Sequence, residues 1–77
     1  MSRDIACLDD AIAVAAESIG SLWTRSHALS LVVRYAEIDA RAARRQGDLK
    51  RAAELDAIAA DADHAQTVEL RQARGAA

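Results

Sequence analysis

Five basic side chains gather in a short stretch near the middle of the chain. Arg41, Arg44, Arg45, Lys50 and Arg51 give residues 41–51 a net charge of +4, although the whole chain carries −2. Clustered arginine and lysine can hold phosphate groups, which would make this stretch a nucleic-acid site. The same cluster could instead meet an acidic protein surface, and cations also collect at helix C-termini for purely structural reasons. Because the charge is local and no aromatic residue interrupts it, nucleic acid is not the expected partner.

Acidic side chains dominate the segments on either side of this basic stretch. Residues 52–70 carry five carboxylates and no lysine or arginine, and residues 1–20 have a net charge of −3. Carboxylates spaced along a helix can imitate a phosphate backbone and so occupy the nucleic-acid groove of a basic protein. The simpler alternative is a solvated helix face. The candidate partner-binding residues are Asp9, Asp10, Asp56, Asp61 and Asp63.

In size and charge, such a chain resembles small inhibitors encoded by phages and mobile elements, including some anti-CRISPR proteins. That resemblance implies a non-enzymatic regulator that occludes a basic, nucleic-acid-handling partner.

Asp61 and His64 form the one pair with the spacing of metal ligands. Residues three apart share a helix face, and the pair resembles the Glu-x-x-His element of di-iron helical bundles. A two-fold dimer would double the pair, and Glu37 would add a carboxylate. Asp in place of Glu shortens the reach, however, and a surface histidine is the simpler interpretation, so no metal or cofactor is expected.

Trp23 and the potential nucleophiles complete the set of chemically notable residues. Trp23 is expected to fill a small core, or else to anchor an interface, where tryptophan is favoured. Ser26 and His27 are neighbours on a helix and point about 100° apart, so they form no nucleophile–base pair. Without a glycine-rich phosphate loop either, an enzyme is not expected.

Three helices are predicted to position these residues, over about 3–19, 22–46 and 49–74. Gly20, Gly47 and Gly75 stand at the three predicted ends, and no strand or hairpin pattern is present. Ser2 is a candidate cap for the first helix and Asp48 for the third, while Ser21, Thr24 and Ser26 are alternatives for the second. The short Gly47–Asp48 joint makes the last two helices a long antiparallel hairpin, and the chain is a single all-α domain.

The middle helix has two apolar stripes at three- and four-residue spacing, which predicts contact with the helices before and after it. One stripe holds Leu22, Leu29, Val33, Ala36, Ala40 and Ala43; the other holds Leu31, Tyr35, Ile38 and Ala42, with Val32 between them. The expected buried stripe of the first helix is Ile5, Leu8, Ile12, Ala15, Ala16 and Ile19. That of the third is Ala52, Leu55, Ile58, Ala62 and Ala65, followed by Val68 or Glu69.

Small size and high alanine content point to association. Alanine supplies 20 of the 40 apolar residues in this chain of 77, so large side chains for a core are few. The sequence therefore predicts a homodimer formed through alanine-rich faces. One cysteine, Cys7, excludes an internal disulfide, and no secretory or membrane-spanning segment is evident, so the cytoplasm is the expected location.

Overall fold

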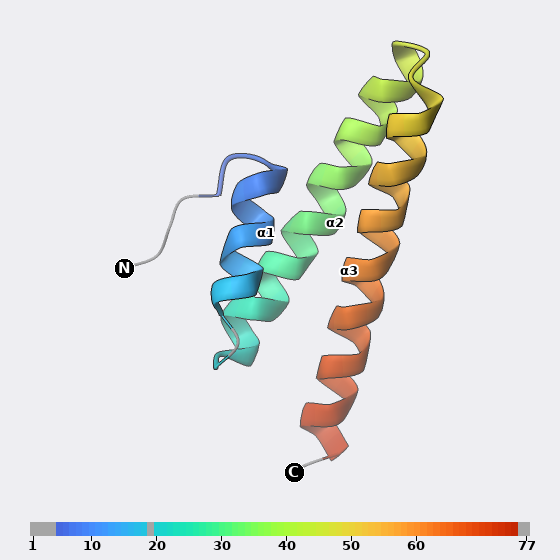
Figure 1. Ribbon diagram of the computed structural model, residues 1–77. Coiled ribbons are helices and arrows are strands. Elements are labelled where there is room, and N and C mark those ends of the chain that lie inside the picture. Colours follow the sequence, from blue (N-terminus) through green and yellow to red (C-terminus); the bar gives the residue numbers. More distant parts are fainter. Residues whose placement is uncertain (1–4, 19, 76–77) are drawn as a thin grey trace.

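The computed structural model describes residues 5–18 and 20–75, which fold as three α-helices (Figure 1). They are α1 (Leu8–Glu17), α2 (Leu22–Arg45) and α3 (Leu49–Gly75). The all-α class is confirmed, and α2 and α3 pack along each other as a long antiparallel hairpin, as the short joint predicts.

The ends of the hairpin helices use the expected capping residues. Ser21 caps α2, because its side-chain oxygen accepts a hydrogen bond from the backbone N–H of Thr24. Asp48 caps α3 in the same way, with its carboxylate accepting from the backbone N–H of Arg51 at 3.1 Å. Between the helices, Gly47 has φ of +80°, a left-handed conformation that side chains other than glycine adopt at a cost.

Helix α1 is shorter than the expected 3–19. It begins at Leu8 after the extended residue Cys7 and ends at Glu17, with Ser18 as its C-cap. The proposed cap Ser2 lies outside the described residues. Ile5 is not helical, and its carbonyl accepts a hydrogen bond from the Tyr35 hydroxyl at 3.4 Å. The first helix is therefore ten residues long and covers one end of α2 (Figure 1).

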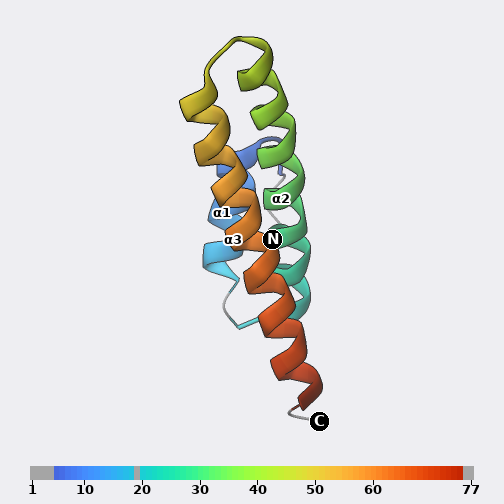
Figure 2. The same cartoon turned by 90° about the vertical axis from the view of Figure 1, so that its right-hand side faces the viewer.

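The three helices form a nearly flat layer rather than a closed bundle. Helices α1 and α3 both pack against α2, on different sides of it, and within the described ranges they do not pack against each other. The Cα atoms span 46 × 28 × 13 Å, which is about the thickness of a single layer (Figure 2). The expected contact of the middle helix with both neighbours is confirmed.

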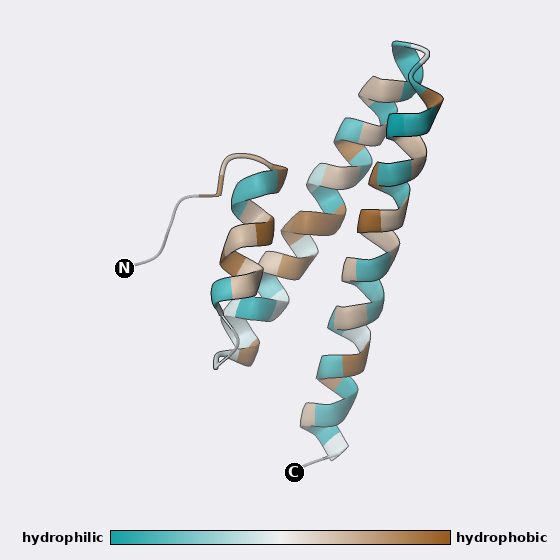
Figure 3. Ribbon diagram, viewed as in Figure 1, coloured by the Kyte–Doolittle hydropathy of each residue, from teal (hydrophilic) through white to brown (hydrophobic). Residues whose placement is uncertain are grey.

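The core is small and built mainly from alanine. Hydrophobic residues, brown in Figure 3, alternate with hydrophilic ones, teal, along all three helices. Thirteen apolar side chains are buried among the described residues, and nine of them are alanines, which let the helix backbones approach closely. Leu55 is the largest fully buried side chain. The other buried large residues are Leu8, Leu29 and Val32.

Several residues predicted to be buried are exposed instead. Ile12, Leu22 and Ile38 are 41%, 41% and 47% exposed, and Ala16 is exposed as well. Because α1 packs against α2 alone, only one narrow side of α1 is buried. Because α1 has ten residues, it is also too short to cover the C-terminal half of α2. The predicted stripes are correct in periodicity but wrong in how much of them a neighbour covers.

Candidate protein-binding faces

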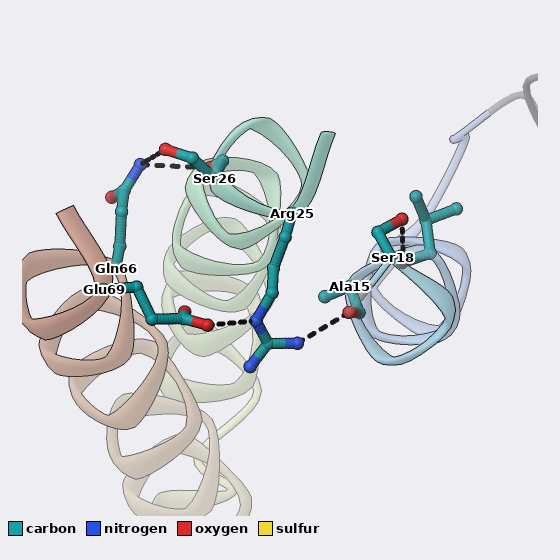
Figure 4. Close-up of polar contacts among 7 residues, drawn as sticks. Ala15, Ser18, Arg25, Ser26, Gln66 and Glu69 are labelled. Atoms are coloured by element: carbon teal, nitrogen blue, oxygen red, sulfur yellow. Dashed lines mark hydrogen bonds and ion pairs between the residues drawn. The ribbon is translucent and has the colours of Figure 1, made fainter. Parts of the chain in front are cut away.

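Arg25 defines one of the two broad faces of the layer (Figure 4). From α2, its guanidinium donates a 2.6 Å hydrogen bond from Nε to Glu69 on α3 and another of 2.6 Å from Nη1 to the Ala15 carbonyl on α1. This contact bridges the two outer helices, which otherwise do not meet. We call the side of the layer on which Arg25 lies the inner face.

The inner face carries apolar residues on both outer helices, which we call its apolar strips, and on α3 polar residues lie between them. On α3, the positions at three- and four-residue spacing from Glu69 share its side, and these are Glu54, Ile58, Asp61, Ala65 and Gln72. On α1, Ser18 points away from Arg25 and the Ala15 carbonyl points toward it (Figure 4), so the next positions round the helix, Ile12 and Ala16, also lie on this face. The inner face is thus partly apolar and uncovered.

Unpaired carboxylates surround these apolar strips. Asp61 on α3, Asp39 on α2 and Asp9 at the outer edge of α1 are exposed and form no ion pair with a described residue. The Oε2 atom of Glu69 is buried and has no hydrogen-bond partner among the described groups. By contrast, Glu54 is paired with Arg51 at 3.5 Å.

A shallow pocket of about 220 Å³ lies near the bend of the hairpin, beyond the reach of α1. It is lined by Asp39, Ala42, Ala43, Gln46, Asp48, Arg51 and Leu55. Like the inner face, this pocket combines apolar side chains with carboxylates, here those of Asp39 and Asp48.

The five acidic residues singled out from the sequence do not lie on one face. Asp61 and Asp63 are two residues apart on α3 and therefore point about 200° apart. Asp63 shares its side with Asp56, which forms an ion pair with Arg44 of α2. Asp10 accepts a hydrogen bond from the backbone N–H of Ala6 and so stabilises the start of α1. Of the five, Asp9 and Asp61 border the inner face.

The opposite face, which we call the outer ridge, is the solvent-exposed side of α2. Seven positions at three- and four-residue spacing are exposed along its whole length: Trp23, His27, Ser30, Arg34, Glu37, Arg41 and Arg45. Trp23 is 84% exposed, so its assignment to the core is wrong. It stands at the first turn of α2, where neither neighbouring helix covers it.

The basic cluster predicted around the bend is partly neutralised. Arg44 pairs with Asp56 and Arg51 pairs with Glu54, whereas Arg41, Arg45 and Lys50 pair with no described residue. Arg34, which belongs to the same helix side as Arg41, is likewise unpaired within the described residues. Of these four unpaired cations, Arg34, Arg41 and Arg45 lie on the outer ridge and Lys50 lies at the bend.

Asp61 and His64, the proposed metal ligands, are both exposed on α3. No group of three or more histidine, cysteine or acidic side chains within residues 5–18 and 20–75 is placed to hold a metal ion. The pair therefore has no third ligand from the described part of the same chain. Cys7 is an exposed free thiol at the start of α1.

The residues that join the helices were missed in the sequence analysis. Besides Arg25 and Glu69, Gln66 of α3 donates hydrogen bonds from its side-chain amide to the Ser26 and Ser30 hydroxyls of α2, at 3.1 and 2.6 Å. The sequence did contain an indication of this ion pair. Glu69 lies at the end of the apolar stripe of the third helix, and Arg25 interrupts an apolar stripe of the second helix. Polar residues of opposite charge at stripe positions indicate pairing across the interface.

No helix in the described part of the chain is long and apolar enough to cross a membrane. Comparison of the sequence with protein-family models and with curated proteins, and of the fold with solved structures, finds no match.

Proposed function

We propose that this protein is a non-enzymatic regulator or inhibitor that acts in the cytoplasm by binding another protein through its inner face. The occupant of that face is an amphipathic helix with basic side chains. The observation that carries the proposal is the combination, on one uncovered face, of exposed apolar residues with carboxylates that have no partner among the described residues.

The apolar part of the argument rests on the open architecture. A layer of three helices leaves one side of each outer helix uncovered, and here that side holds Ile12 on α1 and the partly buried Ile58 on α3. A fourth helix laid along the inner face would bury both and complete a four-helix bundle. Binding a helix in a groove in this way uses anchor residues at three- and four-residue spacing.

The acidic side chains on the inner face favour a partner helix that carries basic side chains. Asp9, Asp39 and Asp61 are exposed and therefore available to basic side chains of the partner. Charge complementarity of this kind raises association rates and rejects acidic partners. The most specific form of the proposal is a phage- or mobile-element-encoded inhibitor that occludes a basic, nucleic-acid-handling protein.

Charge reversal at Asp61 and Asp63 tests the proposal with a matched pair. Both side chains are exposed on α3, and both Asp→Lys changes alter the charge equally, but Asp61 borders the inner face and Asp63 does not. The unmodified chain is first used to capture a protein from extracts of the source cell. That protein is then identified, purified and titrated with each variant by calorimetry. Asp61→Lys should weaken binding at least tenfold, and Asp63→Lys less than twofold.

Recovery of a protein by itself does not support the proposal. If the recovered protein binds both variants equally, or loses affinity for Asp63→Lys alone, the inner face is not the binding site. An Ile12→Glu variant adds an independent measurement, since it changes the apolar strip on α1 without altering α3.

The proposal includes a homodimer formed through α3. Most alanines of the predicted alanine-rich faces are buried inside the monomer, but Ala53, Ala57 and Ala60 form an exposed row on the side of α3 away from α2. Small residues allow two such helices to approach closely. Light scattering should give twice the chain mass for the unmodified protein and a single chain mass for Ala57→Glu, while Ala16→Glu on α1 stays dimeric. A monomer mass for the unmodified protein at all concentrations would contradict this.

A further inference from the structure

We propose that the outer ridge is a second binding site, for single-stranded nucleic acid, with Trp23 stacking on a base and three arginines contacting phosphates. This site is separate from the inner face and does not depend on the function proposed for it. The first observation is Trp23 itself, whose indole is 84% exposed although the chain has few large apolar side chains to bury. Unpaired bases stack on exposed aromatic rings whatever their sequence.

The second observation is the alignment of free charge with this tryptophan. Arg34, Arg41 and Arg45 lie on the same side of α2 as Trp23, and none of them pairs with a described residue. At a rise of 1.5 Å per residue, Trp23 and Arg45 are about 33 Å apart along the helix. An extended strand that follows the ridge would therefore meet a stacking surface at Trp23 and guanidinium groups from Arg34 to Arg45.

The structure also favours a single strand over the alternatives. Bases in a duplex are stacked on one another and offer no free face to Trp23. A membrane surface requires an apolar helix face, whereas the ridge is polar beyond its first turn. Glu37 within the ridge and Asp63 beside it repel phosphates, so we expect moderate affinity and strong dependence on salt.

The natural fluorescence of the protein reports on this site, because Trp23 is the single tryptophan of the chain. Titration with the oligonucleotide dT8 at low salt should quench that fluorescence. With three phosphate contacts, the logarithm of the association constant should fall against the logarithm of salt concentration with a slope of about −2. An eight-base-pair duplex should bind more weakly and leave the fluorescence nearly unchanged.

Two substitutions with the same change of charge locate the site. Arg41→Glu, on the ridge, should weaken binding of fluorescein-labelled dT8 at least tenfold in an anisotropy titration. Arg71→Glu, exposed on α3, should change it less than threefold. Trp23→Ala should weaken binding about tenfold, in line with the loss of one stacked base. Circular dichroism confirms that each variant is folded.

Three results would overturn the proposal. One is binding of dT8 without quenching, and another is equal loss of affinity in the Arg41→Glu and Arg71→Glu variants. The third is a blue shift of the fluorescence with phosphatidylserine vesicles and no response to dT8, which would assign the ridge to an anionic membrane surface.

Discussion

Replacing Leu55 with alanine should remove about 3 kcal/mol from the free energy of unfolding. Leu55 is 1% exposed and is the largest fully buried side chain among the described residues. Truncating a buried leucine loses its transfer free energy and leaves a cavity, for a typical total of about 2–5 kcal/mol. A domain of this size rarely has more than about 3–5 kcal/mol of core stabilisation, so the variant should be close to unfolding at room temperature.

Leu49→Ala is the matched control for this prediction. It makes the same chemical change in the same helix, but Leu49 is 69% exposed in the first turn of α3. Its effect on the free energy of unfolding, measured by urea denaturation, should be below about 0.5 kcal/mol. If the two variants unfold at the same urea concentration, the α2–α3 interface around Leu55 is not the main source of stability.

The boundaries and caps of the two hairpin helices were readable in the sequence because they depend on local chemistry, whereas α1 is shorter than expected. Gly47 supplies the left-handed residue between the hairpin helices, and Ser21 and Asp48 each accept a backbone hydrogen bond at a helix start. Such contacts join residues three positions apart. A window of a few residues therefore contains all the information needed.

The extent of burial was not readable, because it depends on how far each helix reaches along its neighbour. The first helix has the periodicity of a longer segment, yet α1 is ten residues long and packs against α2 alone. Ile12 and Ile38 are consequently exposed, although both occupy stripe positions. Periodicity identifies the apolar side of a helix but not the length over which a partner covers it.

The candidate site likewise combines features that local sequence predicts with features that depend on how the helices pack. Asp9 and Asp61 were identified from charge, but which side of α3 borders the inner face depends on how α3 packs against α2. The bridge from Arg25 to Glu69 joins residues 44 positions apart, a distance over which local patterns carry no information. Opposite charges at stripe positions indicate that an ion pair crosses the interface, but they do not identify which two residues form it.

The close approach of α2 and α3 leads to the second large prediction, which concerns Ala40. Arg44 pairs with Asp56, so the antiparallel register places Ala40, one turn earlier, opposite the buried Ala59, one turn after Asp56. Ala40 is 0% exposed, so no space remains for three more carbon atoms. Ala40→Leu should push the helices apart and lower the free energy of unfolding by about 1–3 kcal/mol, measured by urea denaturation.

The control for Ala40→Leu makes the same substitution where space is available. Ala73 is exposed near the end of α3. Ala73→Leu should leave the free energy of unfolding within about 0.5 kcal/mol of that of the unmodified protein. If the two helices could separate enough to hold a leucine, Ala40→Leu would instead raise the free energy of unfolding through the added buried apolar area. That result would show that α2 and α3 are not held at the short separation that their facing alanines imply.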